Sequence, residues 1–171
     1  GEASILKVLS QGLQVLFDIH SVLFFLYDRE RDVLVGKGIT GDKENNLSNH
    51  VEIPYQKEKS LLARSLYQET ALDSFSDSTK AAPTIMDKQL IRFLGKDGML
   101  CLPMIAHRTH VGVIVIGIDE HHFSHLRDRV KLLTMFASQA ALGLAADHLR
   151  QDEINRLRGI LKKIQGVLDK G

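Results

Sequence analysis

Cysteine, charge imbalance and long apolar runs are all scarce in this chain, and each scarcity excludes a class of protein. Cys101 is the only cysteine among 171 residues, which excludes an internal disulfide and favours a reducing compartment. We therefore expect a cytoplasmic location. Twenty-two basic residues against 21 acidic ones leave a net charge of +1. Because the sequence contains no basic block, nucleic acid is not an expected partner.

Membrane-spanning and catalytic signatures are missing as well. No apolar run approaches the ~20 residues of a transmembrane helix, and the N-terminus lacks the basic, apolar and small-residue regions of a signal peptide. We therefore expect no membrane contact by this chain. The motifs G-x-S-x-G, G-x-x-x-x-G-K-[S/T] and H-E-x-x-H do not occur. The sequence thus predicts neither an enzyme nor a bound cofactor.

What the sequence does contain is enough apolar residue, 44% of the chain, to bury the core of one domain. The apolar spacing predicts helices over 4–19, within 54–70 and over 86–94, the last ending at Gly95. It also predicts two strand hairpins, 21–27 with 33–39 and 99–105 with 111–118, and a brief strand at 71–72. Residues 41–50 and 74–83 have the composition of loops. This order favours a largely antiparallel sheet with helices packed on it.

A long helix follows the second hairpin, and two apolar patterns coexist on it. Val130, Ala137, Ala141 and Leu144 form a stripe suited to lying on a sheet. The second pattern alternates by three and four residues, which is the spacing of a coiled coil. This heptad seam comprises Leu126, Leu133, Phe136, Ala140, Gly143, Asp147, Arg150, Ile154, Leu157, Leu161, Ile164 and Leu168.

The heptad seam continues past Leu149, where the predicted sheet has ended. A partner chain is the simplest way to bury it, so we expect a homodimer through the terminal helices. The alternative is a helix that folds back on its own domain. Asp147 and Arg150 interrupt the seam and either form an interchain ion pair or stay solvated. We therefore expect a domain over 1–149 and a coiled-coil or linker helix over 150–171.

Four segments of the chain together resemble a GAF domain, a small-molecule-binding regulatory module of signalling proteins. They are VLFFLYDRERDVLVGKGITG, EKSLLARSLYQETALDS, GMLCLPMIAHRTHVGVIVIGID and FSHLRDRVKLLTMFASQAALGLAADHL. The resemblance implies a PAS-related α+β fold whose antiparallel sheet carries the terminal helices on one face. Short helices and loops are expected to close a pocket on the other face. The resemblance also implies a small ligand, a dimeric helical bundle and an attached output domain.

The specialised chemistries of the GAF family find little support in these residues. Free methionine sulfoxide reductases of this type need redox cysteines, whereas the chain has only Cys101. Bilin-binding members attach the pigment through a cysteine usually followed by histidine, but Cys101 lies between two leucines of a predicted strand. We expect a buried, unreactive thiol. The Asn-Lys pair of cyclic-nucleotide-binding members is missing, although Asp119, Glu120 and Phe123 are present.

Five histidines fall close together in the sequence, and clustered histidines favour metal ions. They are His107, His110, His121, His122 and His125. The first two flank a hairpin turn, and an eight-residue strand separates them from the others by ~25 Å. The last three are able to converge, but with Ser124 as a helix N-cap the segment is typical of an exposed turn. We expect no metal site.

The resemblance places candidate pocket residues on the first hairpin, the 74–83 loop, the short helix and the second hairpin. These candidates are Phe25, Tyr27, Asp73, Ser76, Asp77, Phe93 and Cys101. For each of them the alternative is ordinary packing, and the polar ones are also typical of turn residues that cap the backbone. The leading hypothesis is a non-enzymatic sensory domain. The alternatives are a purely structural dimerisation module and an enzyme related to the sulfoxide reductases.

Overall fold

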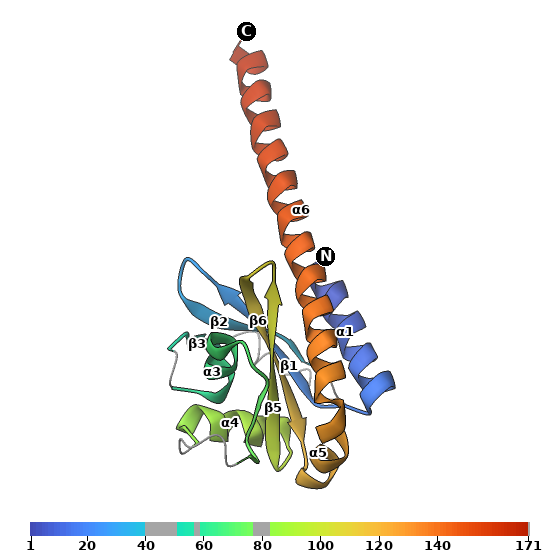
Figure 1. Ribbon diagram of the computed structural model, residues 1–171. Helices are drawn as coiled ribbons and strands as arrows, with labels where there is room; N and C mark the ends of the chain where they lie inside the picture. The colour runs from blue at the N-terminus through green and yellow to red at the C-terminus, as the bar shows by residue number, and fades with distance from the viewer. Residues whose placement is uncertain (40–50, 57–58, 77–82, 171) are drawn as a thin grey trace.

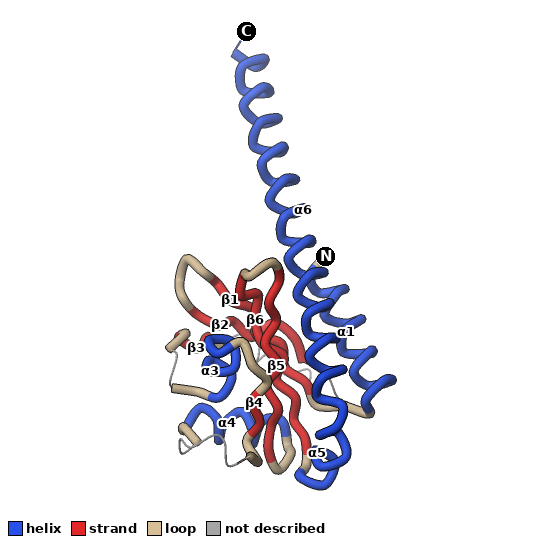
Figure 2. Tube along the Cα trace, in the orientation of Figure 1, coloured by secondary structure: helices blue, strands red, loops and turns tan. Residues whose placement is uncertain are grey.

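The computed structural model describes residues 1–39, 51–56, 59–76 and 83–170. Its centre is a six-stranded antiparallel sheet with the strand order β3-β2-β1-β6-β5-β4 (Figures 1 and 2). The strands are β1 (Val22–Asp28), β2 (Val33–Ile39), β3 (Glu52–Pro54), β4 (Leu72–Asp73), β5 (Gly98–Ala106) and β6 (Thr109–Ile118). The helices are α1 (Glu2–Phe17), α3 (Leu61–Gln68), α4 (Ile85–Leu94), α5 (Glu120–Leu126), the 3-10 turn η1 (Arg127–Arg129) and α6 (Val130–Lys170). The predicted α+β class is confirmed.

The strand β6 lies inside the sheet and is covered on both faces. Val111 to Ile118 are all buried, which explains why the sequence shows an apolar run rather than an alternating pattern. The turn between β5 and β6 consists of His107 and Arg108, whose φ angles are 50° and 64°. Positive φ at both positions matches the twist of a two-residue hairpin.

The terminal helices α1 and α6 cover one face of the sheet and lie side by side (Figure 1). Leu6 and Leu13 of α1 share this core with the stripe residues Ala137, Ala141 and Leu144 of α6. The small alanine side chains allow the backbone of α6 to approach the sheet closely. The predicted sheet-facing stripe is confirmed at these three positions.

The helices α3 and α4 cover the other face, and one carboxylate joins their first turns. Asp87 is 4% exposed; its Oδ1 accepts the backbone N–H of Leu61 at 2.8 Å, and its Oδ2 accepts that of Thr84 at 3.0 Å. Thr84 Oγ1 in turn accepts the N–H of Asp87 at 3.1 Å, which completes a capping box. Because helix N-termini leave N–H groups unsatisfied, this carboxylate stabilises both helices at once.

Two local expectations differ from the structure. The edge strand β3 was not predicted, because it is only 3 residues long and ends in Pro54, a residue that sheets tolerate at an edge. The predicted N-cap at Ser124 is wrong: α5 begins at Glu120 after Asp119, and the Ser124 hydroxyl donates to the His121 carbonyl. The expected loop at 41–50 and residues 77–82 of the second loop lie outside the described residues.

The helix α6 is 41 residues long and projects far beyond the sheet (Figure 1). Its first half packs on the domain, whereas every residue from Gln151 to Lys170 is exposed. No helix in the described part of the chain is long and apolar enough to cross a membrane.

Candidate functional site

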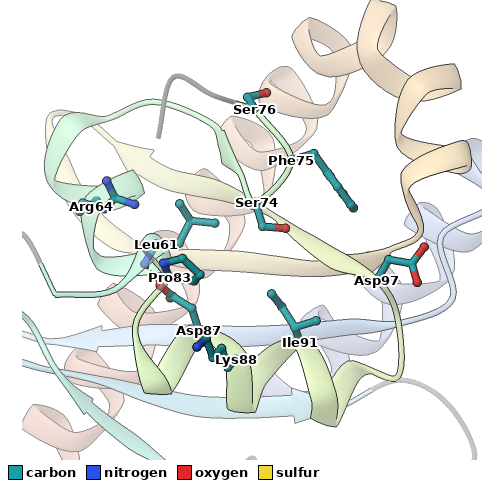
Figure 3. A pocket seen from close by; sticks show the side chains of 10 residues that line it. All are labelled: Leu61, Arg64, Ser74, Phe75, Ser76, Pro83, Asp87, Lys88, Ile91 and Asp97. Carbon is teal, nitrogen blue, oxygen red and sulfur yellow. Dashed lines mark hydrogen bonds between the residues drawn. The ribbon is translucent and has the colours of Figure 1, made fainter. Parts of the chain in front are cut away.

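A polar cleft opens between α3, α4 and the segment that follows β4 (Figure 3). Its volume is about 420 Å³. The side chains that line it are Leu61, Arg64, Ser74, Phe75, Ser76, Pro83, Asp87, Lys88, Ile91 and Asp97. The cleft lies on the α3 and α4 side of the sheet, which is the side on which the resemblance predicts a pocket.

The chemistry of the polar cleft is set by two cations and two carboxylates. Arg64 comes from α3 and Lys88 from α4, while Asp87 and Asp97 supply the acids (Figure 3). Asp87 already accepts hydrogen bonds from two backbone N–H groups, so its negative charge is stabilised within the protein. Arg64 and Lys88 are therefore the groups best suited to meet an acidic ligand, because guanidinium and ammonium groups both bind carboxylate and phosphate.

An apolar crevice lies between α4 and the first strand, with a volume of about 190 Å³. Its lining comprises Leu23, Phe25, Val51, Met86, Gln89, Leu90 and Phe93, with no charged side chain among them. Two of the predicted pocket residues, Phe25 and Phe93, thus lie in one crevice. Such a surface suits an aliphatic or aromatic group rather than a charged one.

Between and beneath these openings, the face is filled by the protein's own side chains. Leu62, Leu66, Met99 and Val113 are all fully buried there, together with Cys101. The polar cleft and the apolar crevice therefore have no lining residue in common and flank a packed core.

Asp73 and Ser76 form a closed turn at the rim of the polar cleft. Asp73 Oδ1 accepts the backbone N–H groups of Phe75 and Ser76 at 2.9 and 2.7 Å. Its Oδ2 accepts the Ser76 hydroxyl at 2.8 Å. This geometry is the turn-capping arrangement expected as the alternative for these residues. Asp77, the third polar candidate, lies outside the described residues.

Tyr27 lies at the end of β1 and lines neither opening. Its hydroxyl donates to Asp32 at 2.5 Å, and its ring centroid lies 5.0 Å from that of Tyr55. The hydrogen bond to the Asp32 carboxylate favours the neutral phenol and raises the pKa of Tyr27 to about 12. The structure therefore separates Tyr27 from Phe25, two residues before it on the same strand.

Cys101 is fully buried in β5, and its expected burial is confirmed. Burial raises the pKa of the thiol well above its usual range, and the negative charge of Asp87 adds to the effect. The thiol is therefore held neutral. A neutral, buried thiol is a poor nucleophile, because the thiolate is the reactive form.

Arg64, Lys88 and Asp87 were not among the residues predicted to form a site. Asp87 follows Thr84 by three positions, a spacing that signals a capping box but says nothing about α3. Arg64 is a single cation in the otherwise apolar and small segment LLARSL. Arg64 and Lys88 line the same cleft only because of how α3 and α4 pack, and no local pattern encodes that.

The heptad seam divides into two parts with different surroundings. Leu126, Leu133 and Ala140 are buried within the domain, and the half-buried Phe136 packs edge-on against Phe17 of α1 at 6.2 Å between centroids. Gly143 is exposed and Asp147 is half-buried. From Arg150 onward the members are exposed: Arg150, Ile154, Leu157, Leu161, Ile164 and Leu168. The continuous exposed part of the seam, from Arg150 onward, is the part that a partner helix is able to cover along its length.

The histidines lie in two groups at opposite ends of β6, as the length of this strand predicted. His107 occupies the β5–β6 turn, and His110 Nε2 lies 3.0 Å from Glu69 Oε1. At the other end of β6, the rings of His121 and His125 meet on α5 with centroids 4.7 Å apart. Within the described residues no group of three or more histidine, cysteine or acidic side chains is arranged to hold a metal ion.

Solved structures of three other proteins share this architecture with the chain. A methyl-accepting chemotaxis protein (residues 122 to 287) has a TM-score of 0.66 and 18% identity, over 86% of this chain and 89% of that one. The GAF domain of a two-component sensor histidine kinase from Bacillus halodurans has a TM-score of 0.65 and 19% identity, over 86% and 96%. A type II free methionine-R-sulfoxide reductase from Thermoplasma acidophilum has a TM-score of 0.58 and 16% identity, over 83% and 91%.

Identities at this level establish a shared fold and nothing finer. No curated protein sequence matches the chain. The family model of the GAF domain, in contrast, matches residues 3–146, which include every strand, nearly all of α1 and the part of α6 that packs on the domain. The chain therefore belongs to the GAF domain family.

Proposed function

We propose that this chain is a non-enzymatic, cytoplasmic sensory domain that passes a signal along α6 to an attached output domain. The observation that carries the proposal is the continuity of α6. One helix of 41 residues contributes Ala137, Ala141 and Leu144 to the core and then extends 20 exposed residues past the domain, from Gln151 to Lys170. A rigid helix with one half in the core transmits a shift of the core to whatever follows it.

In this proposal, the signal is a small ligand that binds to the face of the domain covered by α3 and α4. Arg64 and Lys88 favour an acidic group in the polar cleft, and the crevice at Phe25 and Phe93 favours an apolar group. The polar cleft is also connected to α6 through packed side chains. Phe75 lines it and stacks on Phe123 of α5 with centroids 5.2 Å apart, and η1 then leads into α6.

The partner in the proposal is a second copy of this chain, paired in parallel along 150–171. The seam members Ile154, Leu157, Leu161, Ile164 and Leu168 are between 36% and 68% exposed. Ile160 and Val167 lie beside them and widen the apolar stripe. Because an isolated helix of this length is marginal in water, burial of the stripe against an identical helix supplies the missing stabilisation. A parallel pair also delivers both C-termini to the same output domains.

The experiment for the pairing is sedimentation equilibrium of the chain and two variants. We expect a dimer at tens of micromolar for the parent chain and a monomer for Leu161→Lys, which places a charge in the seam. Asn155→Lys is the matched control, since it adds the same charge to the side of α6 that faces away from the seam. A parent chain that stays monomeric at this concentration contradicts the pairing.

The experiment for the ligand is a thermal-shift screen with nucleotides, amino acids and small carboxylates. A specific ligand raises the melting temperature by mass action, and Arg64→Ala is expected to remove the rise. The rival proposal is a purely structural dimerisation module, which the packed core around Leu62 and Leu66 favours. It predicts a dimer whose melting temperature no compound raises.

The enzymatic alternative rests on the structural similarity to the sulfoxide reductase. A thiol cycle with a resolving cysteine requires two cysteines, whereas the chain has only the buried Cys101. We therefore expect no thiol-dependent reduction of free methionine sulfoxide. Turnover in such an assay that is lost in Cys101→Ser would overturn the non-enzymatic proposal.

A further inference from the structure

His121 and His125 form a close pair of imidazoles on the surface of α5. They are one helical turn apart, so both side chains lie on the same face of the helix. Their ring centroids are 4.7 Å apart with the planes at 88°, and the two Nε2 atoms are 3.3 Å apart. Both residues are exposed, so an ion has direct access from solvent.

The separation of the two nitrogens matches the bite of a tetrahedral metal ion. Zinc binds imidazole nitrogen at about 2.0–2.1 Å, so two ligands at a tetrahedral angle have their nitrogens roughly 3.3 Å apart. Two histidines spaced by four residues on a helix are also the spacing that H-E-x-x-H proteins use for zinc. Imidazole is the ligand that zinc, nickel and copper share.

Three other histidines of the described residues each contact a carboxylate. His20 Nε2 lies 2.6 Å from Asp18 Oδ1, and this hydrogen bond lowers the pKa of Asp18. His110 contacts Glu69 and His148 contacts Glu2, each at 3.0 Å. His121 Nε2 and His125 Nε2 instead lie within hydrogen-bond distance of one another, at 3.3 Å, and an ion bound by both nitrogens replaces this hydrogen bond.

We propose that His121 and His125 form a two-histidine chelate for a divalent transition metal ion of the zinc, nickel and copper class. Water or a ligand from outside the chain fills the other coordination positions, since the described residues hold no larger donor group. The ion bridges one turn of α5, the helix that joins β6 to η1 and α6. Binding therefore stabilises the turn at which the sheet passes into the long helix. The chelate does not depend on the proposed sensory function.

The test is calorimetric titration of the tag-free chain with Zn²⁺ in a non-coordinating buffer near neutral pH. We expect one ion per chain, and at least a tenfold loss of affinity in His121→Ala and in His125→Ala. The loss of even an outer-shell partner costs about 10- to 100-fold in metal affinity, so the loss of a direct ligand costs no less. His122→Ala is the matched control and keeps the affinity of the parent chain.

A second measurement identifies the ligands directly. Cu²⁺ bound to the parent chain is expected to show nitrogen hyperfine splitting from two imidazoles, reduced to one in either variant. Unchanged Zn²⁺ affinity in His121→Ala and His125→Ala overturns the proposal, and so does an equal loss in His122→Ala. Circular dichroism of each variant checks that the chain still folds.

Discussion

At the scale of single residues, Asp87 connects two helices that are distant in the sequence. It caps its own helix α4 through Thr84 and also accepts the first N–H of α3 from Leu61. The apolar pattern and Gly95 predicted the helix over 86–94, whereas the Thr-x-x-Asp spacing at its start is visible in the sequence but was not used. The bond to Leu61 spans 26 positions, so only the packed structure reveals it.

Replacement of Asp87 by alanine is expected to lower the free energy of unfolding by about 2–3 kcal/mol. The change leaves the buried Leu61 N–H without its charged acceptor, and a hydrogen bond to a charged group is worth about 1.5–3 kcal/mol. The Thr84 N–H is only part-buried, so water replaces its lost bond. Urea unfolding followed by circular dichroism measures the change. Asp97→Ala is the control, because Asp97 is exposed. A loss in Asp87→Ala no larger than that control contradicts the double-cap account.

The thiol of Cys101 is expected to resist modification while the chain is folded. Its raised pKa means that the folded protein keeps the proton when the unfolded chain, with a thiol pKa near 8.5, releases it. The stability that comes from this group is therefore complete below about pH 8.5 and is lost as the pH rises further.

A chromogenic disulfide reagent at pH 8 measures the accessibility of this thiol. We expect no reaction on the timescale of minutes for the folded chain, and one equivalent per chain after addition of guanidinium chloride. Rapid reaction of the folded chain would show that Cys101 is accessible and would reopen the question of thiol chemistry.

At the scale of elements, the apolar pattern of α6 predicts which positions are apolar on each face but not how wide the buried face is. The sequence contained both a sheet-facing stripe and a heptad seam on this helix. It did not reveal that Leu133 and Ala140 of the seam also lie in the core. In a helix of 3.6 residues per turn, positions adjacent to the stripe rotate toward the sheet or toward α1. Only packing against α1 and the sheet decides how wide the buried face is.

A larger side chain at Ala141 is expected to disturb this packing. Ala141 is fully buried against the sheet, so Ala141→Leu forces the helix outward and lowers the free energy of unfolding by about 1–3 kcal/mol. Ala146→Leu makes the same change at an exposed position of α6 and is expected to alter stability by less than about 0.5 kcal/mol. Thermal unfolding of the two variants side by side tests the predicted difference, and equal effects would contradict it.

At the scale of the whole molecule, the fold could be predicted from the sequence, whereas the site could not. Alternating helix and hairpin signals specify an antiparallel sheet with helices on it, since each element must bury its apolar face. The polar cleft depends on Arg64 and Lys88, which come from two helices whose approach is set by the core at Leu62 and Leu90. Of the predicted pocket residues, Phe25 and Phe93 share the crevice and Ser76 reaches the cleft, while Tyr27 lies apart from both.

The central claim is that two copies of α6 pair in parallel beyond the domain, and disulfide cross-linking tests it most directly. Leu161→Cys places a thiol in the exposed part of the seam, and Lys163→Cys places one on the opposite side of the same turn. The native Cys101 is buried and does not interfere. In a parallel pair the two Cys side chains at the seam position meet within the Cα separation of a disulfide, about 4.4–6.8 Å. We predict that mild oxidation converts Leu161→Cys into a covalent dimer and leaves Lys163→Cys monomeric; no cross-link in Leu161→Cys, or equal cross-linking of both variants, would contradict the account.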